Sequence, residues 1–169
     1  MKEKPRRRDE SLVSKSMMAN ILVPGIWMVI VGFVLLKCPF ILNILHVDPS
    51  IIGNGTTEAI EAEGILHTVF FVYFIWAALF NGFNCRSDGL DITKGLKENK
   101  NFLKVFLMIV LIQAFIICIG LIPLNFTRSI SMIFSCVPIH WECWVVAIVL
   151  AITVIPIGLL NKVIFKNKK

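Results

Sequence analysis

The sequence predicts an all-α membrane protein: a four-transmembrane-helix bundle with both termini cytoplasmic. Of the 169 residues, 57% are hydrophobic and only 17% are charged, and the mean hydropathy is +0.81. Soluble domains average about 45–50% apolar and about 25% charged residues. The charges are also unevenly spread, because they leave four long stretches that contain no Asp, Glu, Lys or Arg.

The length of these stretches fixes the number of expected helices. They hold 21, 22, 23 and 19 residues, at 16–36, 64–85, 105–127 and 143–161. A helix that rises 1.5 Å per residue needs roughly 20 apolar residues to cross about 30 Å of hydrocarbon. We therefore expect transmembrane helices at 17–36, 65–85, 104–124 and 142–161. A soluble helical protein is disfavoured, since four such segments leave no polar faces for water.

The first helix follows a basic segment, residues 1–16. It carries Pro24 and Gly25 near its start, a pair that can kink a membrane helix where neighbours bond the freed carbonyl. A cleavable signal peptide is not expected, because the segment lacks an Ala-x-Ala-like end and its apolar part exceeds the usual length of about 7–15 residues.

Three loops connect the expected helices. The first, about residues 38–63, ends in an acidic patch at Glu58, Glu61 and Glu63. We expect it to be a solvated loop or the first turn of the second helix; an entrance that attracts cations is the alternative. The middle loop, 86–103, is short and charged. The last loop, 125–141, is expected on the membrane interface or against helix ends, with Trp141 and Trp144 as anchors.

The basic residues set the expected orientation. Fifteen of the 17 Lys and Arg residues lie in segments 1–16, 86–104 and 162–169, whereas Lys37 and Arg128 lie on the other side. By the positive-inside rule, both termini and the middle loop face the cytoplasm. Thus 17–162 forms the membrane domain, flanked by cytoplasmic basic segments 1–16 and 163–169. Lipid headgroups account for the basic ends, and no nucleic-acid partner is expected.

Two amides, Asn81 and Asn84, stand at the end of the second helix. They share one face with Tyr73 and Ala77, because the steps between these positions are four, four and three. Polar groups at membrane depth are costly unless they face protein or water. We expect these amides to hydrogen-bond across a helix seam; ion coordination by their oxygens is the alternative.

The expected partners of these amides are Gln113 in the third helix and Thr153 in the fourth. Ala78 and Gly82, one turn apart, are predicted to allow the close helix approach that such bonds need. Asn81, Asn84 and Gln113 are thus the candidate site residues, as packing contacts or as a polar lining.

Catalytic machinery is not expected. Apart from Lys104 and Glu142 at their first positions, the four helices contain no Asp, Glu, Lys or Arg, whereas proton-coupled carriers usually keep an intramembrane carboxylate. The chain has no Gly-rich phosphate loop and no nucleophile with a nearby base. Its five cysteines form no Cys-x-x-Cys pair, and its three histidines are scattered, so we expect no metal site and no cofactor.

Three segments resemble one family. "KPRRRDESLVSKSMMANIL", "HTVFFVYFIWAALFNGFNCRS" and "MIFSCVPIHWECWVVAI" are similar, in order and spacing, to parts of the C-terminal membrane region of P-type cation-transporting ATPases, nearest to the calcium pumps. They match the link before the seventh membrane helix, the eighth helix, and the outer loop with the start of the tenth. The resemblance covers roughly residues 4–162.

The resemblance implies that the chain supplies helices seven to ten only, as a split subunit or truncated fragment that supports the transport helices. It then lacks the phosphorylation and nucleotide-binding domains, is no enzyme by itself, and has as partners the lipid bilayer and the rest of the pump on another chain. Two-site calcium pumps have a carboxylate at the position of Ala78, so a site with that ligand is in doubt. The alternatives are an independent four-helix assembly or accessory protein, and a small uncoupled carrier or pore.

Overall fold

The computed structural model describes residues 15–86, 91, 99–119 and 135–166, and predictions for the other residues lie outside it. The described residues form helices and no strands: α1 (Lys15–Lys37), α2 (Pro39–Ile44), α3 (Thr57–Arg86), α4 (Lys100–Cys118), α6 (Trp141–Ile152) and α7 (Val154–Lys166). Four segments are long and apolar enough to cross a membrane, namely Met18–Lys37, Thr57–Arg86, Lys100–Cys118 and Trp141–Ile164. The predicted all-α architecture with four membrane helices is confirmed.

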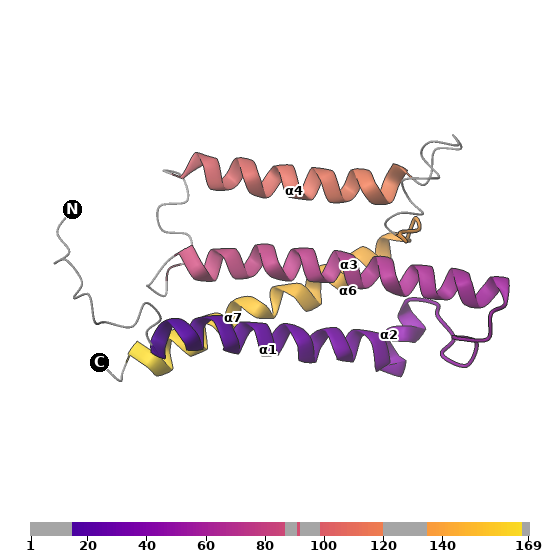
Figure 1. Ribbon diagram of the computed structural model, residues 1–169, viewed down its shortest axis with the longest axis horizontal. Helices are drawn as coiled ribbons and strands as arrows, with labels where there is room; N and C mark the ends of the chain where they lie inside the picture. The colour runs from indigo at the N-terminus through magenta and orange to yellow at the C-terminus, as the bar shows by residue number, and fades with distance from the viewer. Residues whose placement is uncertain (1–14, 87–90, 92–98, 120–134, 167–169) are drawn as a thin grey trace.

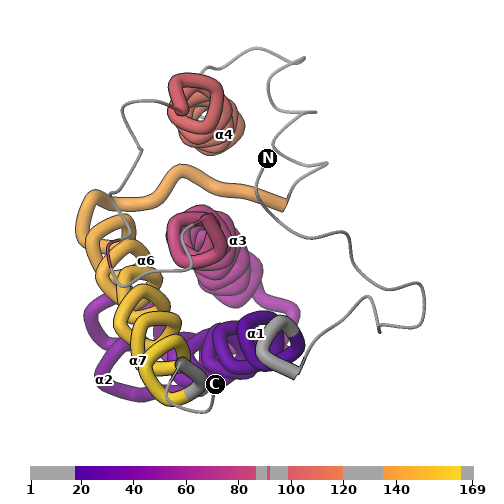
Figure 2. Tube along the Cα trace, turned by 90° about the vertical axis from the view of Figure 1, so that its left-hand side faces the viewer, coloured from indigo at the N-terminus to yellow at the C-terminus, as the bar shows by residue number. Residues whose placement is uncertain are grey.

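The long helices run alongside one another, and α3 is their hub (Figure 1). Viewed along the bundle, α3 lies at the centre, with α4 on one side, α1 on the opposite side and α6–α7 along a third (Figure 2). The start of α1 and the end of α7 lie at the same end of the bundle (Figure 1). The described chain therefore enters and leaves on one side, and the cytoplasmic assignment of that side remains a prediction.

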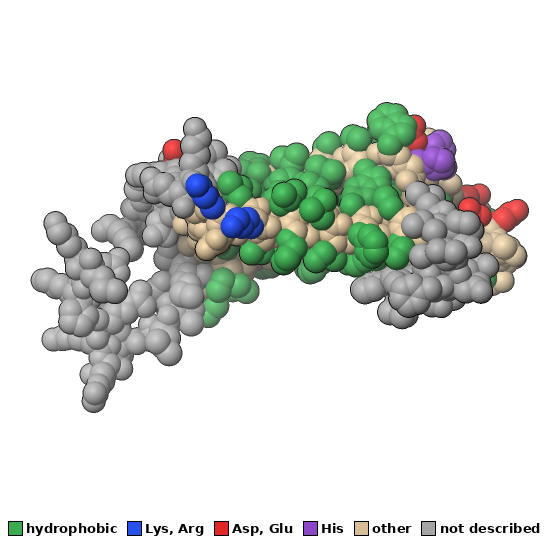
Figure 3. All heavy atoms as spheres, turned by 90° about the horizontal axis from the view of Figure 1, so that it is seen from above, with side chains coloured by type: hydrophobic (Ala, Val, Ile, Leu, Met, Phe, Trp, Pro, Cys, Tyr) green, Lys and Arg blue, Asp and Glu red, His purple; other side chains and the backbone are tan. Residues whose placement is uncertain are grey.

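Small side chains lie in the buried cluster that α3 and α6 share. Ala77 of α3 and Ala147 and Ala151 of α6 have no exposed surface, so the two backbones can approach closely. Larger apolar side chains point outward instead, as Val29 does with 71% of its surface exposed. Figure 3 shows hydrophobic side chains along the middle of the molecule, with Lys and Arg at one end and His with most of the visible Asp and Glu side chains at the other.

The second membrane helix begins earlier than expected, at Thr57 instead of 65. The Thr56 hydroxyl accepts a hydrogen bond from the Ala59 N–H at 3.2 Å, which satisfies one of the free donors at the start of α3. Glu58 lies in the first turn, where a carboxylate is favoured by the helix dipole. The acidic patch is thus helical, as one of the two sequence-based expectations had it.

The first loop is shorter than expected because α3 begins at Thr57, and it contains the short helix α2 at Pro39–Ile44. Proline is favoured at a helix start, where its missing N–H costs nothing. Conversely, α1 runs through Pro24 as one helix, so proline interrupts structure at neither of these two positions.

The fourth membrane segment differs from the single helix predicted at 142–161. It is divided into α6 and α7 at Thr153. Pro156 lacks the N–H that would bond the Ile152 carbonyl in a continuous helix. The Thr153 hydroxyl donates to the Leu150 carbonyl at 2.6 Å, which supports the last turn of α6. The third helix also begins earlier, at Lys100.

Candidate functional site

The candidate site is a set of polar side chains at the seams between helices. Within the described ranges, no three His, Cys, Asp or Glu residues are grouped so that they could hold a metal ion. The buried polar residues are instead Thr68, Asn84, Gln113 and Asn161. Each of these residues forms a hydrogen bond with another part of the chain, and these bonds show which segments are joined.

Asn84 joins α3 to α7. Its side chain is 3% exposed, and its Nδ2 donates to the Val154 carbonyl at 3.0 Å. The backbone of α7 lies directly against this amide, because a Cβ added at Gly158 would overlap the Asn84 side chain. The Asn84 Oδ1 is buried and has no partner among the described residues.

Asn81 lies one turn earlier on α3 and is partly exposed. Its Oδ1 is nevertheless buried and lacks a partner in the described part of the chain. The close helix approach predicted at Ala78 and Gly82 is not found here. Ala78 is exposed, and a Cβ at Gly82 would meet Phe102 only at ordinary contact distance, 3.8 Å.

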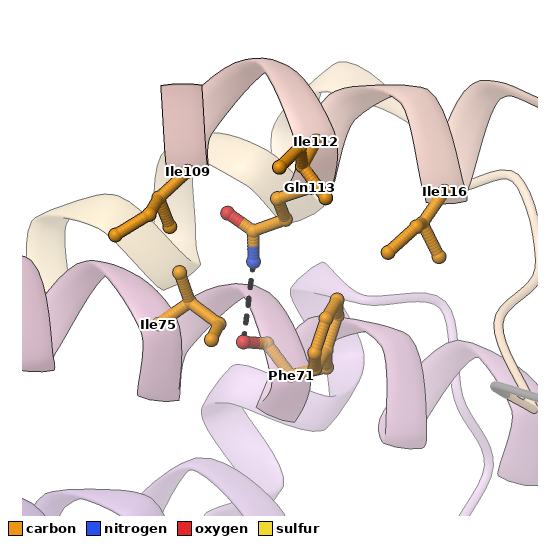
Figure 4. A pocket seen from close by; sticks show the side chains of 6 residues that line it. All are labelled: Phe71, Ile75, Ile109, Ile112, Gln113 and Ile116. Carbon is orange, nitrogen blue, oxygen red and sulfur yellow. Dashed lines mark hydrogen bonds between the residues drawn. The ribbon is translucent and has the colours of Figure 1, made fainter. Parts of the chain in front are cut away.

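Gln113 joins α4 to α3. It is 2% exposed, and its Nε2 donates to the Phe71 carbonyl at 3.3 Å (Figure 4). The Gln113 Oε1 is buried without a partner among the residues described. The predicted pairing of the asparagines with Gln113 or Thr153 is therefore wrong: Asn84 and Gln113 both donate to backbone carbonyls, and Thr153 bonds elsewhere.

Other polar seams were missed from the sequence. The Trp27 Nε1 donates to the Thr153 Oγ1 at 2.9 Å, and the Asn161 Nδ2 donates to the Asn20 Oδ1 at 2.6 Å. The first bond joins α1 to the break between α6 and α7, and the second joins α1 to α7. For the second bond, the sequence shows only that Asn20 and Asn161 each lie within an apolar stretch. It does not show that these two amides meet.

Tyr73 of α3 bonds to α1. Its hydroxyl donates to the Met28 carbonyl at 2.7 Å. A Cβ at Gly32 would lie 3.3 Å from the Tyr73 ring and 3.0 Å from Phe70. Glycine at this position therefore leaves the room that the two rings occupy between the helices.

The described part of the last loop, residues 135–140, bonds to α3. The Val137 N–H donates to the Thr68 hydroxyl at 2.9 Å, and that hydroxyl donates to the Gly64 carbonyl at 2.8 Å. Burial raises the pKa of the Cys136 thiol in this loop. Val137 of this loop thus bonds to α3 within the helix, at Thr68 and not at a helix end.

Together these bonds define a helix-packing membrane domain, in which polar seams join the other three membrane segments to one another and to α3. The chain belongs to the family of the cation transporting ATPase C-terminus, whose model matches residues 1–164. The family resemblance seen in the sequence is thus confirmed, and its calcium-pump type is borne out by the relatives.

The chain is 26% identical over 165 residues to calcium-transporting ATPase 5, plasma membrane-type, of Oryza sativa, covering 97% of this chain and 13% of that protein. It is 24% identical to calcium-transporting ATPase 8, plasma membrane-type, of Arabidopsis thaliana, covering 95% of this chain and 13% of that protein. It is also 25% identical to calcium-transporting ATPase 2 of Schizosaccharomyces pombe, covering 99% and 11%. The chain thus spans only a small part of these relatives, and no solved structure matches it.

Proposed function

We propose that this chain works as the C-terminal membrane domain of a calcium-transporting P-type ATPase, where it supports the helices that carry the ion. The family match over residues 1–164 carries this proposal, together with relatives named as calcium-transporting ATPases. The remaining membrane helices and the cytoplasmic domains of the pump are its partners.

The surface of α3 supports the proposal. Five exposed residues, separated by seven, seven, four and seven positions, form one stripe along this central helix: Ile60, His67, Phe74, Ala78 and Cys85. Such spacing places them on a single helix face. We call this stripe the open face of α3.

The open face lies between the sides of α3 that contact α1 and α4. Tyr73 packs against α1 at Gly32, whereas Phe71 lies opposite α4 at Gln113. No described helix covers the stripe between them (Figure 2). Its small residue Ala78, which is exposed among the described residues, suits the approach of a further helix.

The proposal also holds that the chain alone neither hydrolyses ATP nor transports calcium. The carboxylates of its membrane segments lie only near the helix starts, at Glu58, Glu61, Glu63 and Glu142. Charged side chains at membrane depth are the usual mark of an ion pathway. Ala78, at the position where the resemblance implies a carboxylate in two-site pumps, offers no ligand. The ion is then bound by helices that this chain does not supply.

Reconstitution into sealed liposomes tests the proposal. The purified chain, given ATP and calcium, should show no uptake. Adding the membrane helices and cytoplasmic domains of the pump that contains or accompanies this chain should produce ATP-driven uptake. Uptake by the chain alone, or equal uptake with and without it, would contradict the proposal.

A matched pair of variants tests the role of the open face. Ala78→Phe adds a bulky ring on this face and should lower calcium uptake by the assembled pump. Leu111→Phe changes a residue of α4 that is 60% exposed and should leave uptake unchanged. Equal effects of the two variants would show that the open face is not the supporting surface.

A further inference from the structure

His67 of α3 differs from the other polar residues of the membrane segments, because it faces outward. Within the four charge-free stretches, the Thr, Tyr, Asn and Gln residues whose burial the structure describes are all buried or half-buried, as Asn84 and Gln113 are at the helix seams. His67 is exposed. The contrast is sharpest with its neighbour Thr68, which has no exposed surface and bonds to Val137.

The position of His67 lies within the part of α3 that is expected to cross the membrane. It is the fourth residue of the charge-free stretch 64–85. A rise of 1.5 Å per residue places it about 28 Å along the helix from Arg86, within the roughly 30 Å of hydrocarbon. Ionisable side chains in membrane segments almost always face the bundle interior or a water-filled cavity, and they pair with another polar group. Since no described helix encloses His67, its partner is expected outside these helices.

The positions of the open face repeat every seven residues. Ile60, His67 and Phe74 form one series, and Ala78 and Cys85 form a second series that starts four residues after Phe74. A stripe with this repeat winds slowly around an α-helix, which has 3.6 residues per turn. A second helix stays in contact with such a stripe when the two cross at about 20° in a left-handed coil. The spacing thus fits one helix that runs along most of α3.

The outward surfaces of α1 and α4 are of a different kind. They present large apolar side chains, such as Val29 on α1 and Phe115 on α4, which suit the acyl chains of lipids. The open face combines large side chains with the small Ala78 and the imidazole of His67. Small residues and hydrogen-bonding side chains are the features that join helices within membranes. A helix therefore fits the open face better than lipid does.

We propose that the open face receives one helix from the remainder of the pump, and that this helix carries an amide, hydroxyl or carboxylate side chain that hydrogen-bonds to His67. The inference rests on the proposed function and adds the chemistry of the partner to it. The relatives are long enough to supply such a helix, because the match covers only 13% of calcium-transporting ATPase 5. An imidazole suits each of these groups, since a neutral ring both donates and accepts a hydrogen bond.

Photocrosslinking in the assembled pump tests whether one helix occupies the open face. The probe p-benzoylphenylalanine takes the place of Ile60, Phe74 or Cys85, one position at a time, so that His67 is kept. Mass spectrometry should find all three crosslinks in a single helix of the remainder of the pump, in an order that follows α3. The same probe at Val29 or Leu111, both of which are exposed on other helices, should instead form adducts with lipid.

Variants of His67 test the hydrogen bond. With the rest of the pump supplied as a second polypeptide, the ratio of chain to lipid that gives half-maximal calcium uptake should rise about three- to thirtyfold in His67→Leu, the effect of one hydrogen bond between membrane helices. His67→Gln should recover part of this loss, because an amide also donates and accepts. Phe115→Leu, on the exposed side of α4, is the matched control and should leave the ratio unchanged.

Two sets of results would overturn the inference. Crosslinks from the open face that reach only lipid, or that reach several different helices, would show that no single helix occupies it. An unchanged ratio in His67→Leu, or no recovery in His67→Gln, would show that His67 forms no such bond, as expected if its imidazole contacts lipid headgroups. Each of these results is compatible with uptake that depends on the chain, whereas uptake that is independent of the chain would contradict the proposed function itself.

Discussion

At the scale of single residues, backbone carbonyls are the main partners of the buried side-chain donors. Asn84 donates to Val154, Gln113 to Phe71 and Tyr73 to Met28. A carbonyl oxygen has two lone pairs, so one that is already bonded within a helix can accept a second bond from a neighbouring helix. Such partners cannot be read from residue types, because every residue carries a carbonyl.

Gly158 is predicted to be essential to the α3–α7 seam. Gly158→Ala places a Cβ in the space of the Asn84 side chain, and this overpacking should lower the free energy of unfolding by about 1–3 kcal/mol. Thermal or denaturant unfolding in detergent micelles measures the change. The double variant Asn84→Ala with Gly158→Ala should recover part of the loss.

Gly25→Ala is the control for this prediction. Nothing lies within 4 Å of a Cβ at Gly25, and alanine is favoured over glycine within a helix by roughly 0.5–1 kcal/mol. This variant should be neutral or stabilising. If the two alanine variants lower stability equally, the overlap with Asn84 is not the cause.

Asp48, in the exposed loop between α2 and α3, is predicted to make that loop sensitive to acid. Its Oδ1 accepts a hydrogen bond from the Ser50 N–H at 2.8 Å, and this backbone bond is the main cause that lowers the pKa of Asp48 below its ordinary 3.8. The bond therefore stabilises the turn above pH 3.8 and is lost as the pH falls through the lowered pKa. NMR titration of the Ser50 amide measures this, and Asp48→Asn should abolish the step.

At the scale of elements, the break between α6 and α7 allows the fourth membrane segment to contact two different helices. Helix α6 packs its alanines on α3, whereas α7 bonds to α1 and α3 through Asn161 and Val154. The Thr153 hydroxyl stands at the break, donates to Leu150 and accepts from Trp27. One side chain thus both ends α6 and fixes the position of α1.

Thr153→Val should weaken the α1–α7 seam while it keeps the side-chain volume. The Trp27 N–H then loses its acceptor, at an expected cost of about 0.6–2 kcal/mol in the free energy of unfolding. Trp27 emission should shift to shorter wavelength, seen as the difference from the spectrum of Trp27→Phe. Ile152→Val, at an exposed neighbour, is the control, and an equal spectral shift there would contradict the assignment.

At the scale of the whole molecule, the helix ends that lie together are those that adjoin the basic segments. The start of α1, the end of α3, the start of α4 and the end of α7 lie at one end of the bundle (Figure 1). Most Lys and Arg residues of the chain lie in the segments beside these helix ends. The positive-inside rule therefore predicts that this end faces the cytoplasm.

Cysteine labelling tests this orientation. In a chain that keeps exposed Cys85 as its only cysteine, an impermeant maleimide should react in inverted membrane vesicles and not in intact cells. Ser50→Cys in a cysteine-free chain is the matched control, since Ser50 is exposed in the loop at the opposite end. It should react in intact cells; labelling of both positions from the same side would refute the four-crossing topology.

The sequence by itself determined the fold class and the number of membrane segments. Hydrocarbon thickness requires about 20 uncharged residues for each crossing, and this constraint acts locally along the chain. The sequence also identified the family, through segments such as "HTVFFVYFIWAALFNGFNCRS". The helix start at Thr57 was harder to place, because it depends on capping by Thr56 and not on hydrophobicity.

Only the tertiary structure decided which polar groups meet. The sequence marked Asn84 and Gln113, but their bonds to Val154 and Phe71 depend on how far the helices rotate and how closely they approach. The close contact at Gly158 in place of Ala78 and Gly82 has the same origin. Helix packing is set by the shapes of all the side chains at an interface together, which no local pattern in the chain records.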